Sequence, residues 1–197
     1  ESGSILAEGV PIAEKKRYCG YMPQQDLLFP WRTVAENVGL PLELGEKPLD
    51  RATRRARAEA VLEAVGLQGW ADKSPLSLSG GMRQRAAFAR TLLTGAKLLL
   101  LDEPFSALDY MTRLSMREWL LERWRQERRT ILFVTHDVEE AVFLSARILV
   151  ITSRPVRTLR EFRVPLPYPR SVESLGEPEA LTLKRELIQL LAREMTA

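Results

Sequence analysis

Two neighbouring carboxylates follow an apolar run near the middle of the 197-residue chain. Residues 98–101 are four leucines, and Asp102 and Glu103 come directly after them. A buried strand that ends in two acids places charge at the carboxyl edge of a parallel sheet, where ligands bind in α/β proteins. The carboxylate oxygens of Asp102 could hold the Mg²⁺ of a nucleotide. Glu103 could orient or deprotonate the water that attacks a γ-phosphate. The pattern alone is equally compatible with a buried strand and an ordinary polar turn.

A glycine-led helix start lies just upstream of these acids. Residues 78–85 read Leu-Ser-Gly-Gly-Met-Arg-Gln-Arg and lead into a helical apolar pattern. Ser79 is a good N-cap, while Gly80 and Gly81 let another group approach the backbone closely. A helix N-terminus offers free amides and partial positive charge, which together bind phosphate. A capped helix after a turn explains Ser-Gly-Gly alone, but the whole string beside the acidic strand favours a phosphate site.

Two further polar residues follow apolar strands. His136 is the only histidine and comes after the apolar run 130–135. Its ring donates a hydrogen bond in either neutral tautomer and so suits a phosphate oxygen, although a lone histidine at a strand end is more often structural. Gln24 follows the run 17–22, where its carbonyl would suit Mg²⁺ or the attacking water. The adjacent Gln25 leaves the choice between the two glutamines open.

Apolar strand patterns alternate with longer amphipathic helix patterns. The predicted strands are 17–22, 97–102, 130–135, 147–152 and 160–164. The predicted helices are 50–65, 80–94, 112–128, 137–145 and 177–195. This alternation predicts an α/β fold with a mostly parallel sheet flanked by helices, and strands apolar at every position are expected to be covered on both faces. Residues 33–78 carry no strand pattern and predict a helical insertion.

Composition limits the class of protein. With 45% hydrophobic and 28% charged residues, the chain can bury one sizeable core. The net charge of +3 comes from scattered arginines, which indicates a solvated surface rather than a nucleic-acid site. Cys19 is the only cysteine, so we expect a buried thiol in a reducing cytosol and neither an internal disulfide nor a cysteine-based zinc site. No run approaches the ~18 apolar residues of a membrane span, so work at a membrane would require docking to a partner.

Together these strings resemble the ATP-hydrolysing subunits of ABC transporters, and the resemblance covers nearly the whole chain. The matching segments are, in order, Gln24 for the Q-loop, 78–82 for the signature, 98–103 for the Walker B strand, 106–109 for the D-loop and His136 for the switch histidine. Met82 departs from the glutamine usual at the end of the signature, so only the backbone amides are carried over at that position.

The resemblance implies a fold, cofactors and roles. The fold is that of a P-loop NTPase, and the cofactors are ATP and Mg²⁺. Glu103 and His136 are implied to be catalytic, Asp102 and Gln24 to hold Mg²⁺, and Ser79, Gly80, Gly81 and Asp109 to contribute to the nucleotide site, Asp109 by stabilising the facing loop. The signature is implied to act in trans, across a homodimer that sandwiches ATP head to tail.

Partners and location follow from the same resemblance. The subunit is expected to bind a transmembrane permease, to depend indirectly on a periplasmic or lipoprotein solute-binding protein, and to act as a peripheral protein on the cytoplasmic side of the cell membrane, without nucleic acid. Strings at 28–34, 138–145 and 151–155 are similar to the nitrate/sulfonate/taurine importer branch. Phe29, Pro30 and Trp31 would receive a permease helix, although packing under the insertion is an equal alternative for Trp31. The solute is not specified.

A phosphate-binding loop is missing from the sequence. The string G-x-x-x-x-G-K-[ST] does not occur, nor does the dipeptide Gly-Lys. In the family this loop and an adenine-stacking aromatic precede the segment that resembles residues 1–5. We therefore expect an N-terminally truncated chain that lacks the first strands and the P-loop and is inactive by itself; a natural fragment is the alternative.

Four segments are predicted: the core remainder with the Q-loop at 1–32, a helical subdomain at 33–78, the signature, Walker B and switch-histidine core at 79–170, and a terminal helix at 171–197. The predicted function is ATP hydrolysis that energises solute import. The alternative is a non-catalytic fragment that only binds a permease or a partner subunit. A non-transport ABC ATPase acting on DNA or ribosomes is disfavoured, because the chain has neither long coiled coils nor tandem domains.

Overall fold

A computed structural model describes residues 3–151 and 159–195. These residues divide into two compact units. The first contains the described chain up to Thr112 and the segment Arg128–Val134, and the second contains Arg113–Glu127 and the described chain from Thr135 onward. The four segments expected from the sequence remain a prediction.

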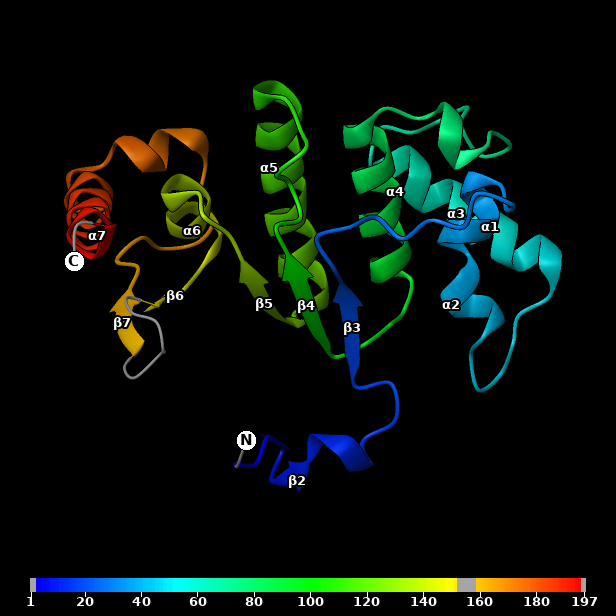
Figure 1. Cartoon of the computed structure of the whole chain (residues 1–197), viewed down its shortest axis with the longest axis horizontal. Coiled ribbons are helices and arrows are strands. Elements are labelled where there is room, and N and C mark those ends of the chain that lie inside the picture. Colours follow the sequence, from blue (N-terminus) through cyan, green and yellow to red (C-terminus); the bar gives the residue numbers. More distant parts are fainter. Residues whose placement is uncertain (1–2, 152–158, 196–197) are drawn as a thin grey trace. The chain divides into compact units, whose positions relative to one another are not determined.

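A three-stranded parallel sheet organises the first unit (Figure 1). It consists, in spatial order, of β3 (Cys19–Met22), β4 (Leu98–Asp102) and β5 (Thr130–Val134). The strands predicted at 17–22, 97–102 and 130–135 are thus confirmed to within two residues. The register pairs Met22 with Leu101, and Asp102 with Val134. Because the strands are parallel, the segments that follow them leave from one edge of the sheet.

The two faces of this sheet differ in burial. Leu99 and Leu101 point to one face and are each 1% exposed, whereas Tyr21, Leu132 and Val134 belong to the other face and are more than half exposed. The expectation that these strands are covered on both faces is therefore wrong for the described chain. An unbroken apolar run had suggested double cover, but burial here alternates along the strands.

Residues 33–78 form helices and contain no strand in the structure, as predicted. The helices are α1 (Val34–Val38), α2 (Leu40–Glu43), α3 (Arg51–Ala64) and the short 3₁₀ helix η2 (Pro75–Ser77). Thr33 and Glu36 form a capping box at the start of α1, and Asp50 caps α3 by accepting a hydrogen bond from the Thr53 amide at 2.9 Å.

Helix α4 (Gly80–Leu92) packs against the buried side of the sheet in the first unit (Figure 1). Phe88 from α4 meets Phe105 edge to face with ring centroids 5.6 Å apart, and both side chains are 1% exposed. This aromatic pair fixes the turn that follows the acidic strand to the core of the unit. The unit also has a short antiparallel hairpin that the sequence did not predict, made of β1 (Leu6–Ala7) and β2 (Val10–Pro11) and followed by the 3₁₀ helix η1 (Ile12–Glu14).

The second unit contains helices and an antiparallel hairpin. Helix α5 spans Tyr110–Glu127, and its part from Arg113 onward belongs to this unit. The other elements are α6 (Val138–Leu144), β6 (Arg147–Ile151), β7 (Leu159–Arg163), the 3₁₀ helix η3 (Val172–Gly176) and α7 (Pro178–Met195). β6 and β7 pair antiparallel. Residues 152–158, with most of the importer-like string 151–155 and the end of the predicted strand 147–152, lie outside the described residues.

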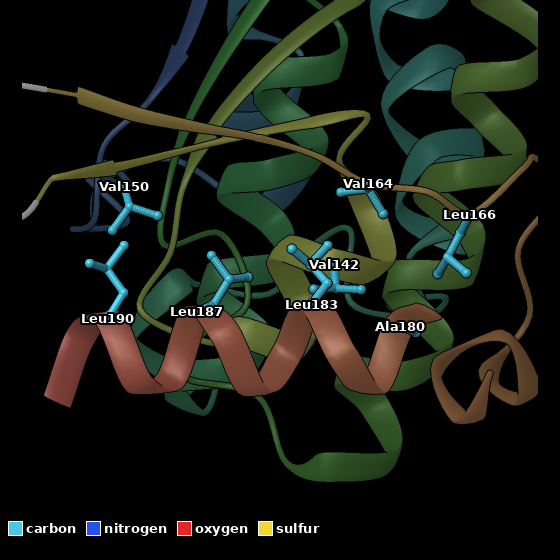
Figure 2. Packing of buried hydrophobic residues seen from close by; sticks show 8 residues of the cluster. All are labelled: Val142, Val150, Val164, Leu166, Ala180, Leu183, Leu187 and Leu190. Carbon is cyan, nitrogen blue, oxygen red and sulfur yellow. The ribbon is translucent and has the colours of Figure 1, made fainter. Parts of the chain in front are cut away.

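The core of the second unit forms along one stripe of α7 (Figure 2). Its buried apolar residues are Ala180, Leu183, Leu187 and Leu190 from α7, Val142 from α6, Val150 from β6, and Val164 and Leu166 from the segment after β7. The α7 residues recur every three or four positions, the spacing of one helix face. Among the described residues, no helix combines the length and apolar character needed to cross a bilayer.

Candidate functional site

The acidic edge of the sheet brings two predicted residues together. The Gln24 side chain, which follows β3, donates from Nε2 to Oε2 of Glu103, which follows β4, at 3.2 Å. The Glu103 amide in turn donates to the Val134 carbonyl of β5 at 2.9 Å. Gln24 and Gln25 are both exposed, and the hydrogen bond to Glu103 identifies Gln24 as the glutamine that contacts the carboxylate. Asp102 ends β4 beside Val134 and is partly buried.

Glu103 has an unusual backbone conformation. Its φ is +47°, in the left-handed region that residues other than glycine rarely adopt. The turn after it closes on the Glu103 carbonyl, which accepts hydrogen bonds from the Ser106 amide at 3.3 Å and the Ser106 hydroxyl at 3.1 Å. Such strain persists where surrounding contacts over-determine the backbone, and it concentrates at functional sites.

Asp109 lies at the end of this turn and caps α5. Its carboxylate accepts from the Thr112 amide at 3.0 Å and from the Thr112 hydroxyl at 2.6 Å. These hydrogen bonds hold the pKa of Asp109 below its ordinary value. The carboxylate is exposed, and its predicted role toward a facing loop stays a prediction.

The signature string starts α4 as expected. Ser79 is the N-cap, and its Oγ accepts from the Met82 amide at 3.3 Å. Ser79 and Gly80 are exposed, so this helix start is open to another molecule. Gly81 is enclosed: a Cβ at this position would lie 3.0 Å from the Ala107 carbonyl oxygen. The two glycines therefore differ: Gly80 leaves open space, whereas Gly81 permits close contact between α4 and the D-loop.

The loop after β3 is anchored to α4. Arg83 pairs with Asp26, Nε to Oδ2, at 3.0 Å. Arg90 donates to the backbone carbonyls of Asp26 at 2.6 Å and of Leu27 at 2.7 Å. Burial lowers the pKa of Arg90. These contacts hold the segment carrying Gln24 against the signature helix.

A buried amide supports the Trp31 loop. Trp31 is 76% exposed and lies against Phe29 with ring centroids 5.0 Å apart, so it does not pack under the helical insertion. Asn37 of α1 is fully buried. Its Oδ1 accepts from the Phe29 amide at 2.7 Å, and its Nδ2 donates to the carbonyls of Phe29 at 3.0 Å and Thr33 at 2.9 Å. The hydrogen bonds of Asn37 therefore hold the loop in place while the Trp31 indole stays exposed.

His136 belongs to the second unit and is exposed. The next residue, Asp137, caps α6 by accepting from the Glu140 amide at 3.1 Å, and it accepts from Arg117 Nη2 at 2.7 Å. Arg117 also pairs with Glu140 at 3.2 Å, and both of these side chains are 5% exposed. Burial alone would raise the pKa of Asp137, but the Glu140 amide and the charge of Arg117 outweigh it and hold that pKa low. That His136 lies close to Glu103 stays a prediction.

Comparison with known proteins identifies the family. Residues 1–106 match the ABC transporter family. The chain is 44% identical over 189 residues to the formylaminopyrimidine import ATP-binding protein ThiZ of Halalkalibacterium halodurans, which covers 95% of this chain and 75% of that protein. The chain belongs to the ABC transporter family.

Two further comparisons extend this result. The chain is 41% identical over 172 residues to the aliphatic sulfonates import ATP-binding protein SsuB of Bacillus cereus, covering 87% of this chain and 66% of that protein. The dimeric ATP-binding cassette MJ0796, solved in a post-hydrolysis state bound to ADP and phosphate, superposes with a TM-score of 0.71 at 28% identity, covering 80% of this chain and 72% of that one. The predicted ABC ATPase fold and the resemblance to the importer branch are confirmed.

Two side chains of this chain are candidate Mg²⁺ ligands. Asp102 and Gln24 offer oxygen ligands of the kind that Mg²⁺ prefers. Among the residues that the structure describes, no cluster of three or more acidic, histidine or cysteine side chains could hold a metal by itself. Mg²⁺ at nucleotide sites is usually held by one or two carboxylates together with substrate phosphates and water.

Three side chains of the cassette were missed by sequence analysis: Asn37, Gln84 and Arg117. Each is at most 5% exposed and hydrogen-bonded to a segment that carries a candidate functional residue. Gln84 could have been noticed in the sequence. It lies four residues from Gly80 and from Phe88, so it places a polar residue on the apolar stripe of α4. A polar residue on a buried stripe indicates a specific partner.

Proposed function

We propose that this chain supplies the ATP-hydrolysing site of an ABC importer of the nitrate/sulfonate/taurine-like branch. The contact between Gln24 and Glu103 is the observation that carries the proposal, because it joins the ends of β3 and β4 at the edge where α/β proteins bind ligands. The relatives named for formylaminopyrimidine and sulfonate import support the import direction.

Each polar group at the edge has a role in this proposal. Glu103 orients or deprotonates the attacking water, and Gln24 holds that carboxylate in place through its amide. Asp102 and the Gln24 carbonyl hold Mg²⁺, which neutralises charge on the nucleotide phosphates. His136 donates a hydrogen bond to a phosphate oxygen. Asp109 stabilises the facing loop of a second subunit.

A second copy of the chain completes the site. Ser79 and Gly80 are exposed at the N-terminus of α4, where backbone amides and the helix dipole favour phosphate. In a head-to-tail homodimer they would meet ATP held by the partner, and two-fold symmetry would create two such composite sites. The dimeric state of the solved cassette MJ0796 supports this arrangement.

The exposed loop around Trp31 is proposed to dock a transmembrane permease. An exposed indole beside a half-buried Phe29 presents apolar area on a supported loop, which suits an anchor in a protein interface. The subunit would then act as a peripheral protein at the cytoplasmic face of the membrane. The permease and a periplasmic or lipoprotein solute-binding protein would select the solute.

Substitution of Glu103 tests the catalytic part of the proposal. The experiment uses a complete subunit, meaning this chain joined to a phosphate-binding loop. Glu103→Gln should keep nucleotide binding but lower turnover by about 10²- to 10⁴-fold, the usual contribution of a positioned general base. Gln25→Ala is the control and should hydrolyse ATP at the parental rate. Parental turnover in Glu103→Gln would contradict the role of Glu103.

A non-catalytic fragment that only binds a permease or a partner subunit is the second candidate. The observation favouring it is that the 197 residues contain no phosphate-binding loop. Because the amides and lysine of that loop hold the phosphates, the 197-residue chain alone should show no measurable ATPase and no tight ATP binding. Nucleotide titration and an ATPase assay of the purified chain check this, and measurable hydrolysis would contradict it.

A further inference from the structure

One buried side chain of the signature helix forms hydrogen bonds with the turn that begins at Glu103. Gln84 of α4 is 5% exposed. Its Nε2 donates to the Glu103 carbonyl at 2.9 Å and to Ser106 Oγ at 3.1 Å, and its Oε1 accepts from the Ala107 amide at 2.8 Å. All three hydrogen bonds of this carboxamide therefore go to one short segment that begins at the candidate catalytic residue.

A second, independent contact lies one turn earlier on the same helix. A Cβ at Gly81 would lie 3.0 Å from the Ala107 carbonyl oxygen and 3.2 Å from Leu108 Cδ2. Gly81 and Gln84 are three residues apart and share a helix face. The face of α4 that begins with the signature glycines thus packs directly on the backbone of the D-loop, at two successive turns.

The chemistry of Gln84 suits this task. A carboxamide offers two N–H donors and a carbonyl acceptor without a charge, and the Glu103 turn presents two oxygens and one amide to it. An apolar side chain would leave the Ala107 amide without this acceptor. A carboxylate would still accept from Ala107 but would place negative charge beside the Glu103 carbonyl.

We propose that Gln84 is a positioning residue that couples the signature motif to the catalytic carboxylate of the same subunit. The inference rests on the proposed function, in which Ser79 and Gly80 meet ATP at the partner's site while Glu103 serves its own. A movement of α4 upon closure over one ATP is then passed through Gln84 to the backbone of Glu103. One amide side chain links the two ATP sites of the dimer.

Three variants of the complete subunit test the proposal. Gln84→Met keeps the length of the side chain and removes its hydrogen bonds, while Gln84→Glu keeps the acceptor for Ala107. Thr91→Val is the matched control, because Thr91 is also buried in α4 and donates its single side-chain hydrogen bond to Ala87 within the helix. Turnover, KM for ATP and thermal stability are measured for each.

Gln84→Met should lower kcat by about 10- to 100-fold, the loss that a displacement of about 1 Å causes at a catalytic group, with KM for ATP unchanged. Thr91→Val should leave both constants at parental values. Gln84→Glu should also lose kcat, but its activity relative to the parent should rise as the pH falls from about 8 to about 6, because a buried carboxylate has a raised pKa and its acid form can donate again.

Parental kcat in Gln84→Met, or an equal loss in Thr91→Val at matched stability, would overturn the proposal. Glu103→Gln in the same assay separates the two hypotheses. If Glu103→Gln stops turnover while Gln84→Met does not, only the coupling role is rejected, whereas turnover in both variants rejects the proposed function as well. Should Gln84→Met fail to fold, the pH response of Gln84→Glu decides, and a constant ratio to the parent across that pH range overturns the coupling role.

Discussion

Replacing Asn37 by alanine removes the only described side chain that accepts from the Phe29 amide in the loop around Trp31. The carbonyls of Phe29 and Thr33 lose the Asn37 amide but keep backbone partners, the amides of Arg32 at 3.2 Å and of residue 37 at 3.0 Å, while the Arg32 carbonyl loses a long contact from Asn37 Nδ2 at 3.4 Å. The Phe29 N–H, by contrast, loses its acceptor. The perturbation therefore acts mainly on the partly buried Phe29 N–H.

The magnitude follows from these bonds. An unsatisfied buried donor costs about 1–3 kcal/mol, and each further net hydrogen bond lost costs about 1 kcal/mol. Because the carbonyls of Phe29 and Thr33 retain partners and the contact to the Arg32 carbonyl is long, the expected local loss is about 2–3 kcal/mol rather than the sum of all bonds. At about 1.4 kcal/mol per tenfold change, this corresponds to roughly 30- to 150-fold easier opening of the loop.

Native-state hydrogen exchange of the Phe29 amide measures this opening directly. Asn37→Ala should accelerate exchange at Phe29 by the factor above. Thr33→Ala is the control, since it removes the cap that accepts from the Glu36 amide at 3.2 Å and should accelerate exchange at Glu36 but not at Phe29. Unchanged exchange at Phe29 in Asn37→Ala, or equal acceleration there in Thr33→Ala, would refute the account of the loop.

Two further predictions concern the glycines of α4 and the buried charges near His136. Gly81→Ala should destabilise the chain by about 1–3 kcal/mol through overpacking on the Ala107 carbonyl at 3.0 Å, whereas Gly80→Ala, whose Cβ would meet only Arg83 Nη2 at 4.0 Å, should leave stability nearly unchanged; urea unfolding measures both, and equal losses would contradict the distinction. Because the pKa of Asp137 is lowered by folding, its stabilisation is present above its unfolded pKa of about 4 and is lost as the pH falls through the lower folded value. The stability difference between the parent and Asp137→Asn should therefore shrink on acidification, and a difference that grows would contradict the sign. Arg117→Met should cost about 3 kcal/mol at neutral pH, since it leaves Glu140 buried without its cation; a loss near zero in urea unfolding would show that the pair is not a stabilising one.

Local patterns were sufficient to predict much of the fold and several site residues. The acids after the four leucines and the glycines of the signature were recognised because strand and helix periodicity place them at element ends. Gln24 and Glu103 each follow a predicted strand, and because parallel strands end at one sheet edge, their side chains meet there, Nε2 to Oε2, at 3.2 Å.

Long-range partners were beyond the sequence. In the sequence, Asn37 resembles any other helix residue, and its hydrogen bond to the Phe29 loop appears only in the fold. Gln84 likewise makes its hydrogen bonds to a segment about twenty residues away. The exposed face of β5 was mispredicted for a related reason. An apolar run shows what a strand could bury but not what covers it, and Leu132 and Val134 are more than half exposed in the described chain.

The central claim is that each ATP is hydrolysed between Glu103 of one subunit and Ser79 of another. Mixed dimers of the complete subunit test it most directly. If the site is shared, Glu103→Gln on one subunit and Ser79→Arg on its partner leave one composite site intact, whereas both substitutions on the same subunit damage both sites. We therefore predict that the split dimer retains ATPase activity and that the dimer carrying both changes on one subunit has none. Activity only in the latter would contradict the shared site.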